Sequence, residues 1–376
     1  MQIVKKNILL NPGPATTTDS VKYAQVIPDI CPREAEFGKL MDNVSTELTR
    51  LAAEAEHYTT VLFGGSGTAG VESILSSVVN DGSVLIINNG AYGKRMCEIA
   101  QTYGLNFVEF KSPPNNQIDL TALETLLQTS SCKFSHLAVV HNETTTGLLN
   151  DIEKIGKLCR KYQLDFIVDA MSSFGAIPIQ MKEMNISFLG ASSNKNVQGM
   201  AGIAFVIAEK GKLESLQKSK PRSYYLNLYA QYKYFAKTHQ MRFTPPVQTL
   251  YALKQAIIEL NKEGIMGRYE RYAKSWETLI TGLERLRLAY LVPKKHHSKI
   301  VTAVLEPDCY GYDFNQMHDY FYHKGFTIYP GKIESLKTFR IANIGDINYK
   351  DMEAFLELLE KYLINIGYFS RKGHDQ

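Results

Sequence analysis

The sequence predicts an α/β protein with a large domain, built on a mainly parallel seven-stranded sheet flanked by helices, and a small α+β domain. Seven short runs are rich in β-branched and aromatic residues, and several of them are apolar at consecutive positions, which is typical of strands buried on both faces of a parallel sheet. Helical patterns separate most of these runs, as crossovers between parallel strands require. The 376 residues, 44% hydrophobic and 21% charged, are enough for about two to three globular domains.

The elements of the large domain follow one another in order. The strand patterns cover Tyr58–Phe63, Val84–Ile87, Phe107–Phe110, Leu137–His141, Phe166–Asp169, Phe188–Ala191 and Ile203–Ile207. The helical patterns between them cover Thr68–Val79, Tyr92–Tyr103, Leu120–Leu127 and Ile152–Tyr162.

The pattern changes near Pro245 and Pro246, where two long helical patterns follow with no strand between them. We expect residues 21–245 to form the large domain, and residues 1–20 together with 246–376 to form the small one. The elements predicted after the change are helices at Val247–Glu263, Gly267–Leu288, Phe314–His323 and Tyr349–Ile364, and strands at Ile300–Leu305, Phe326–Tyr329 and Thr338–Ala342.

Composition narrows the functional class. The net charge is +4 from 42 basic and 38 acidic residues, with no basic stripe, so no nucleic-acid partner is predicted. No apolar run approaches the roughly 20 residues that span a bilayer, so no membrane partner is predicted. Five scattered cysteines without CxxC, and an N-terminus without an apolar signal region, favour a cytoplasmic protein.

The first candidate site is the glycine-rich segment Phe63–Gly70, between a predicted strand and a predicted helix. Backbone N–H groups at a helix N-terminus, with the hydroxyls of Ser66 and Thr68, suit a phosphate group. The glycines also satisfy GxGxxG, so a nicotinamide dehydrogenase stays open as an alternative. That class needs an acidic residue about 20 positions on, where this chain has Asn88 and Asn89. Close packing of the helix on the sheet is the purely structural alternative.

Two further candidates follow predicted strands. Asp169 ends an apolar strand, which places its carboxylate at the sheet edge where α/β proteins bind ligands; a helix N-cap is the alternative. Lys195 is the one charged residue between Glu183 and Glu209. Such an isolated amine suits covalent catalysis, although an exposed lysine is the ordinary case. Residues 192–195 also fit SxxK, but the serine acyl-enzymes with that motif need KTG and SDN partners, which the chain lacks.

Together, the three candidates favour one cofactor. A phosphate cup, an aspartate at a strand end and a lysine 26 residues beyond that aspartate are present. Pyridoxal 5′-phosphate needs a phosphate site, a carboxylate for its pyridine nitrogen and an amine for a Schiff base. We therefore predict this cofactor. No HExxH motif or Cys/His cluster occurs, and no metal site is predicted.

Several stretches of the chain match a known family. They are Leu10–Pro14 followed by three threonines, Ser66–Thr68, His141–Gly147, Asp169–Gly175, Ser193–Lys195 with Gln198–Gly199, and Phe339–Ile341. On these residues the chain resembles class V, fold-type I aminotransferases, which use pyridoxal phosphate, over nearly its whole length. Within that class it is most similar to 2-aminoethylphosphonate–pyruvate aminotransferases, and less so to serine–pyruvate and alanine–glyoxylate enzymes.

The resemblance implies a role for each matching residue. Lys195 would hold the cofactor covalently, and Asp169 would keep its pyridine nitrogen protonated. The cofactor phosphate would be held by Ser66, Gly67 and Thr68.

More residues would surround the cofactor by the same resemblance. Tyr92 would stack on the ring, Thr144 would lie near the ring oxygen and Met171 would pack beneath it. Asn194 would neighbour the phosphate, and Thr244 would reach the phosphate of the neighbouring subunit in a homodimer. Ordinary packing is the alternative for Tyr92 and Met171, and turn formation for Asn194.

Arg340 matches the family's arginine for the acidic group of the substrate, with a strand-edge ion pair as the alternative. Residues 29–38 depart from the aromatic-rich sequence of many relatives, and Arg33 within them is a second candidate anion contact. The implied reaction, part of phosphonate metabolism, converts 2-aminoethylphosphonate and pyruvate to phosphonoacetaldehyde and L-alanine. A serine or alanine aminotransferase acting with glyoxylate or pyruvate, a hydroxylated-aminophosphonate aminotransferase and a non-catalytic binding protein stay open as alternatives.

Overall fold

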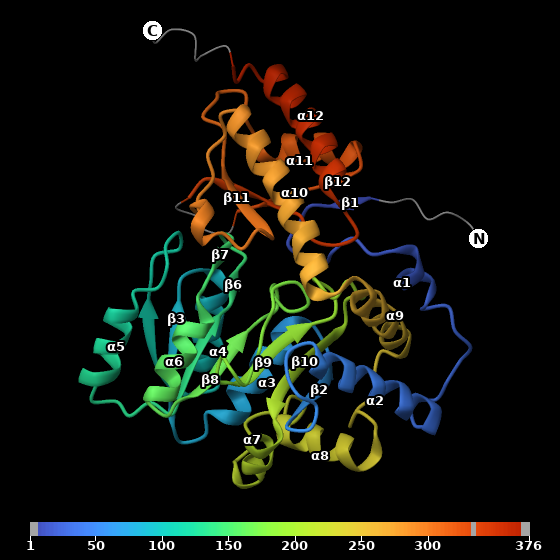
Figure 1. The fold of residues 1–376 in the computed structure, drawn as a ribbon, viewed down its shortest axis with the longest axis vertical. Helices are drawn as coiled ribbons and strands as arrows, with labels where there is room; N and C mark the ends of the chain where they lie inside the picture. The colour runs from blue at the N-terminus through green and yellow to red at the C-terminus, as the bar shows by residue number, and fades with distance from the viewer. Residues whose placement is uncertain (1–6, 332–335, 370–376) are drawn as a thin grey trace.

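A seven-stranded sheet forms the centre of the large domain in the computed structural model, which describes residues 7–331 and 336–369 (Figure 1). Its order is β2-β10-β9-β8-β5-β3-β4, and every neighbouring pair is parallel except the two that β10 makes. The predicted sheet is confirmed, since each predicted run is one of these strands. They are β2 (Tyr58–Gly64), β3 (Ser83–Asn88), β4 (Asn106–Lys111), β5 (His136–Val140), β8 (Asp165–Asp169), β9 (Ile186–Ser192) and β10 (Ile203–Glu209).

Helices cover both faces of this sheet, which explains why its strands are apolar at consecutive positions. In β8, Phe166 and Val168 belong to one buried cluster and Ile167 to the other. The first face is covered by α2 (Ala35–Arg50), α5 (Leu120–Thr129), α6 (Ile152–Lys161) and α9 (Val247–Glu263). The second face is covered by α3 (Gly67–Val78), α4 (Ala91–Thr102), α7 (Lys210–Ser215) and α8 (Leu228–Thr238).

The small domain has its own core, shared by residues from both ends of the chain. Leu10, Trp276, Phe339 and Phe355 are buried together in it. The strand β1 (Ile8–Leu9) of the N-terminal arm pairs in parallel with β12 (Phe326–Thr327). The other elements are α10 (Ile265–Arg285), α11 (Phe314–His323), α12 (Tyr349–Asn365), and the antiparallel sheet of β11 (Val301–Leu305), β14 (Thr338–Ala342) and β13 (Tyr329–Pro330).

The junction between the domains lies at a helix pair. A boundary at residue 245 puts α9 in the small domain, yet Leu250, Leu253 and Ile257 of α9 are buried in the same cluster as Phe37 of the large domain. The next helix, α10, contributes to the core of the small domain. We therefore propose that the boundary lies at Gly264, which separates α9 from α10 and has a φ of 76°.

Some elements have no counterpart among the predicted ones. They are α1 (Asp19–Tyr23), α2, α7, α8, the 3₁₀ turns Leu216–Lys218 and Lys294–His296, and the small hairpin of β6 (Asn142–Glu143) and β7 (Leu148–Leu149). Within the described ranges, no helix is both long and apolar enough to cross a membrane.

Candidate active site

A cavity of about 190 Å³ lies where β8 and β9 end. Because β10 is antiparallel to both of its neighbours, β2 runs in the same direction as β9. The turn after β2 and the loop after β9 therefore meet at one edge of the sheet. The cavity is lined by Ser66, Gly67, Thr68, Val71, Tyr92, Arg95, Met96, Asp169, Met171, Ser192, Asn194 and Lys195. Eight of these are predicted cofactor residues, and Thr144, Thr244, Arg340 and Arg33 are not among them.

The glycine-rich turn presents the N-terminus of α3 to the cavity. Ser66 is the N-cap of this helix, and its side chain makes no capping hydrogen bond. The first N–H groups of a helix have no partner inside the helix and carry its positive dipole end, which favours an anion. A Cβ built on Gly67 would lie 2.6 Å from Sδ of Met171 and 3.4 Å from Oγ of Ser192, so only glycine leaves this side of the cavity open.

Asp169 supplies a buried carboxylate at the end of β8. Its side chain is 6% exposed, and Oδ1 accepts a hydrogen bond of 2.9 Å from the Met171 N–H. Burial raises the pKa of Asp169 above its ordinary value, while that N–H and the charges of Lys195 and Arg95 oppose the rise. A cationic partner in the cavity would therefore stabilise the ionised carboxylate.

Lys195 lies in the loop that connects β9 and β10. The loop is closed by a hydrogen bond of 2.8 Å from the Gly199 N–H to the Ser193 carbonyl. Nζ of Lys195 lies 5.5 Å from the centroid of the Tyr92 ring. The N-terminal arm covers the stem of the lysine, because a Cβ built on Gly13 (φ +144°) would lie 3.1 Å from Cε of Lys195.

Arg95 is a cation in the cavity that the sequence reasoning missed. Its guanidinium carbon lies 4.9 Å from the centroid of the Tyr92 ring, and Nη1 donates to Oγ1 of Thr68 at 3.4 Å. A signal was available, because Arg95 is three positions after Tyr92 and such positions share one face of a helix. The cavity therefore holds two cations, Arg95 and Lys195, near the N-terminus of α3.

Glu143 is a second missed residue, and it fixes the start of α4. Its buried carboxylate accepts from the N–H groups of Tyr92 (3.2 Å) and Gly93 (3.3 Å), where the N-cap residue Gly90 offers no side chain. A Cβ on Gly90 would lie 2.4 Å from the carboxyl carbon of Glu143. Burial raises the pKa of Glu143, and hydrogen bonds from Thr145 and Gly93 oppose the rise. The β6–β7 hairpin thus positions Tyr92.

Arg340 of the small domain interacts with Tyr92, which lines this cavity. It lies in β14 with 2% of its side chain exposed, and it donates from Nε to the Pro330 carbonyl (3.0 Å) and from Nη1 to the Thr144 carbonyl (3.3 Å). Burial lowers the pKa of Arg340, while a hydrogen bond with Tyr92 and the charge of Glu143 oppose the change. Thr144 itself is buried in the turn between β6 and β7.

Thr244 and Arg33 do not line the cavity of their own chain. Thr244 is exposed. Arg33 donates from Nη1 to the Met241 carbonyl (2.8 Å) and to Oε1 of Gln240 (3.1 Å), and from Nη2 to the Arg242 carbonyl (3.3 Å). The guanidinium of Arg33 therefore holds the turn that leads to Thr244. Its contact with a substrate stays a prediction.

A larger cavity, of about 540 Å³, lies at the opposite end of the sheet, where β8 and β9 begin. Charged side chains line it, but Lys212 and Asp165 already form an ion pair of 2.6 Å. In residues 7–331 and 336–369, no group of three or more His, Cys, Asp or Glu side chains could hold a metal ion. The smaller cavity is therefore the candidate active site.

Comparison with known proteins agrees with this fold and cavity. The profile of the family "Aminotransferase class-V" matches residues 19–317. The 2-aminoethylphosphonate–pyruvate transaminase of Klebsiella pneumoniae is 40% identical over 357 residues, which are 94% of this chain and 96% of that protein. The chain therefore belongs to the class V aminotransferase family, and the resemblance stated above is confirmed.

Two other comparisons extend this result. The bifunctional phosphonoacetaldehyde hydrolase/aminoethylphosphonate transaminase of Clostridioides difficile is 40% identical over 360 residues, but this chain spans only 56% of that longer protein. The crystal structure of an alanine–glyoxylate aminotransferase from Nostoc sp. has a TM-score of 0.89 and 27% identity, and the match covers 96% of each chain. The class V aminotransferase fold is therefore confirmed for nearly the whole chain.

Proposed function

We propose that the protein transfers the amino group of 2-aminoethylphosphonate to pyruvate, giving phosphonoacetaldehyde and L-alanine, with pyridoxal phosphate as cofactor. One observation carries the proposal: a cavity at the sheet edge unites the N-terminus of α3, the buried carboxylate of Asp169 and the amine of Lys195, and buried Arg340 interacts with Tyr92 of its lining. The names of the relatives support the substrates. The bifunctional relative also supports the product, since its name includes a hydrolase for phosphonoacetaldehyde.

The residues that line the cavity fit this cofactor. The space that Gly67 leaves open, in front of the N–H groups of α3, suits a phosphate group. Asp169 is a buried carboxylate whose raised pKa would fall beside a protonated ring nitrogen. When bound, the group would supply a carbonyl for amine exchange and a ring that withdraws electrons from the substrate carbon.

Lys195 would act as the base and acid of the reaction. Once the substrate amine has replaced it, Nζ of Lys195 would take a proton from the amino-bearing carbon of the substrate. It would then deliver a proton to C4′ of the cofactor. Gly13 restricts the stem of this lysine from the side of the N-terminal arm. Glu143 holds the backbone N–H of Tyr92, and the ring of Tyr92 would limit another side of the site.

Arg340 would bind the acidic group of both substrates. A guanidinium can bind a phosphonate or a carboxylate in bidentate fashion, and one arginine can serve both because they enter in turn. Burial makes the arginine selective, since a buried cation needs an anionic partner. Its hydrogen bonds to the Pro330 and Thr144 carbonyls fix its direction.

The test of this function is a half-reaction. Purified protein loaded with pyridoxal phosphate is mixed with 2-aminoethylphosphonate without pyruvate, and the visible absorption band is followed. We expect the band to disappear with one equivalent of phosphonoacetaldehyde per chain, and pyruvate to restore it with one equivalent of L-alanine. Ethylphosphonate, which lacks the amine, should leave the band unchanged. A band that responds to serine, alanine or a hydroxylated aminophosphonate, but not to 2-aminoethylphosphonate, would contradict the proposed donor.

Replacement of Arg340 tests the substrate contact. We expect Arg340→Gln to raise the activation free energy that corresponds to kcat/KM by about 2–5 kcal/mol for both substrates, because one partner of a buried charge pair is lost. This lowers kcat/KM by roughly thirtyfold or more. Arg285→Gln, which removes an exposed ion pair with Glu360, is the control and should leave kcat/KM unchanged. A loss of thermal stability with unchanged kcat/KM would mean that Arg340 is only structural.

The quaternary structure is part of the proposal. A homodimer in which exposed Thr244 reaches the phosphate of the neighbouring site would explain why Arg33 holds this turn so firmly. The protein would act in the cytoplasm, in phosphonate metabolism, with its five cysteines as free thiols.

Replacement of Thr244 tests this arrangement. We expect Thr244→Val to weaken pyridoxal phosphate binding by about 1.5–3 kcal/mol, the value of a hydrogen bond to a charged group, and to leave the affinity for unphosphorylated pyridoxal unchanged. Equilibrium dialysis measures both affinities, and sedimentation velocity measures the mass. A fully active monomer, or an equal loss for both ligands, would contradict the arrangement.

A further inference from the structure

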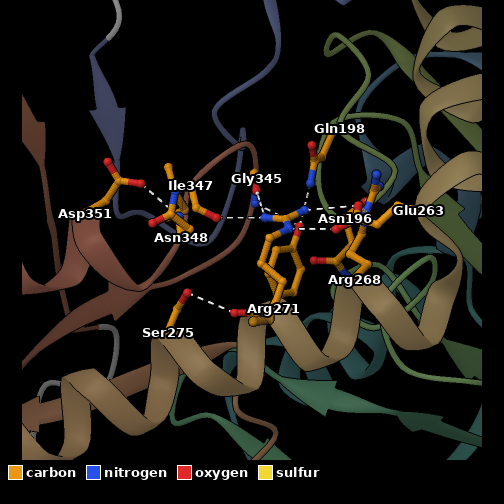
Figure 2. Close-up of polar contacts among 11 residues, drawn as sticks. Asn196, Gln198, Glu263, Arg268, Arg271, Ser275, Gly345, Ile347, Asn348 and Asp351 are labelled. Carbon is orange, nitrogen blue, oxygen red and sulfur yellow. Dashed lines mark hydrogen bonds and ion pairs between the residues drawn. The ribbon is translucent and has the colours of Figure 1, made fainter.

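A network of charged side chains connects the loop between β9 and β10, here called the lysine loop, to α10 (Figure 2). Arg268 of α10 has only 2% of its side chain exposed. Its Nη1 donates to the carbonyl of Asn196 at 2.5 Å, and its Nε donates to Oε2 of Glu263 at 2.7 Å. Asn196 directly follows Lys195, so this arginine holds the backbone next to the lysine.

The same network continues into the small domain. Glu263 also accepts from Nε of Arg271 at 2.6 Å, and Nη1 of Arg271 donates to the carbonyls of Gly345 (2.8 Å) and Ile347 (2.7 Å). Figure 2 shows Arg271 between Gly345 and Ile347 on one side and Glu263 and Arg268 on the other. One carboxylate at the end of α9 thus links the two parts of the molecule.

Tyr272 makes a second connection parallel to the first. Its hydroxyl oxygen accepts from Nε2 of Gln198 at 2.8 Å and from the N–H of Gly345 at 2.9 Å. Gln198 adopts a φ of 63°, a conformation that a residue other than glycine takes rarely unless its surroundings hold it. The lysine loop and the segment at Gly345 are therefore tied together twice.

The stability of the fold alone does not require the charged side chains of Glu263, Arg268 and Arg271. Arg268 is buried, while Glu263 and Arg271 are half-buried. Ion pairs with a buried member can often be replaced by apolar side chains without loss of stability. Burial would raise the pKa of Glu263, but hydrogen bonds from Arg271 and Arg268 outweigh burial and hold the pKa below its ordinary value. Both arginines also donate hydrogen bonds to backbone carbonyls, which fixes the direction of the chain at Asn196 and at Gly345.

We propose that Arg268 is a positioning residue for Lys195, and that Glu263 and Arg271 make this position depend on the docking of residues 345–347. The proposal rests on the proposed function, because it takes Lys195 as the cofactor lysine. Movement of the small domain would move Arg271 and Glu263, then Arg268, and then the backbone at Asn196. The segment that carries Arg340 and the loop that carries Lys195 would therefore become ordered together.

The experiment compares Arg268→Gln, Arg268→Lys and Arg271→Gln in the holoenzyme, with Arg285→Gln on the same helix as the control. The readouts are hydrogen exchange of peptides that cover residues 193–199, the midpoint pH of the visible absorption band, and kcat with KM. We expect Arg268→Gln to speed exchange in this loop, shift the midpoint and lower kcat by about 100-fold, as a displacement of about 1 Å can do. KM should change little, and Arg268→Lys should restore part of kcat.

Coupling to the small domain is tested by Arg271→Gln. This change should speed exchange both in residues 193–199 and in residues 343–348, although the side-chain hydrogen bonds of Arg271 go to Glu263, Gly345 and Ile347. If both exchange rates and the midpoint pH match those of the unchanged protein while only thermal stability falls, the network is structural and the inference is wrong. If the unchanged protein has the visible band but 2-aminoethylphosphonate does not convert it, the proposed donor is wrong and the band and exchange data still decide the inference.

Discussion

Lys195→Ala is expected to lose the visible absorption band of the bound cofactor and to stop turnover. The amine is the group that would bind the cofactor covalently and move the proton, and a positioned base alone contributes about 10²–10⁴-fold. Nζ lies 5.5 Å from the Tyr92 ring, in the cavity where the ring of the cofactor would lie. Absorbance spectra and steady-state rates measure both effects.

Two comparisons make this result specific. Lys94→Ala removes a lysine from α4 near the site, but its side chain is 70% exposed and paired with Glu98, so band and rate should be unchanged. Addition of methylamine to Lys195→Ala should restore a small part of proton transfer, because a free amine can enter the space that the side chain leaves. Full turnover of Lys195→Ala would show that another group is the catalytic base.

Asp169→Asn is expected to lower kcat by about 10²–10³-fold, the usual cost of removing one charge that stabilises a transition state. The same change should stabilise the cofactor-free protein at neutral pH. Burial raises the pKa of Asp169, so the folded protein binds this proton more tightly than the unfolded chain does. The free energy of unfolding therefore falls as pH rises from about 3.9 through the folded-state pKa.

This effect is measured by chemical denaturation of the cofactor-free proteins at several pH values between about 4 and about 8. The difference in stability between Asp169→Asn and the unchanged protein should grow through the titration and then stay constant. Asp165→Asn is the matched control, because it changes the same residue type at the opposite end of β8, where Asp165 pairs with Lys212. Asp169→Asn with normal kcat would exclude Asp169 as the partner of the ring nitrogen.

The parts of the fold that were predicted correctly depend on local patterns. Strands of the central sheet are apolar on both faces, and this pattern is visible without knowledge of their neighbours. The helix α2 was missed although Phe37, Met41, Val44 and Leu48 repeat at helical spacing. Residues 29–38 were noted only as a departure from many relatives, with Arg33 as a candidate anion contact, and the helix that begins at Ala35 was not recognised.

The parts of the site that were missed depend on distant partners. Glu143 caps a helix that begins about 50 residues earlier in the chain, and no local pattern near Glu143 indicates that contact. In the sequence, Arg268 lies near the charged residues Glu270, Arg271 and Lys274, a pattern that is typical of a solvent-exposed helix face. Its burial is set by Glu263 and by the Asn196 carbonyl, which only the folded chain brings near.

The place of Lys195 between the two ends of the chain has a consequence for the order in which the site is made. The Ala15 N–H donates to the Asn194 carbonyl at 2.9 Å, and Asp346 N–H donates to the Thr16 carbonyl at 2.8 Å. During synthesis on the ribosome, the glycine-rich turn, Asp169 and Lys195 all emerge before residue 346. A nascent chain therefore contains the glycine-rich turn, Asp169 and Lys195 well before residue 346, whose contact helps to hold the loop next to the lysine. We expect stable capture of the cofactor to be a late event that follows the folding of the small domain.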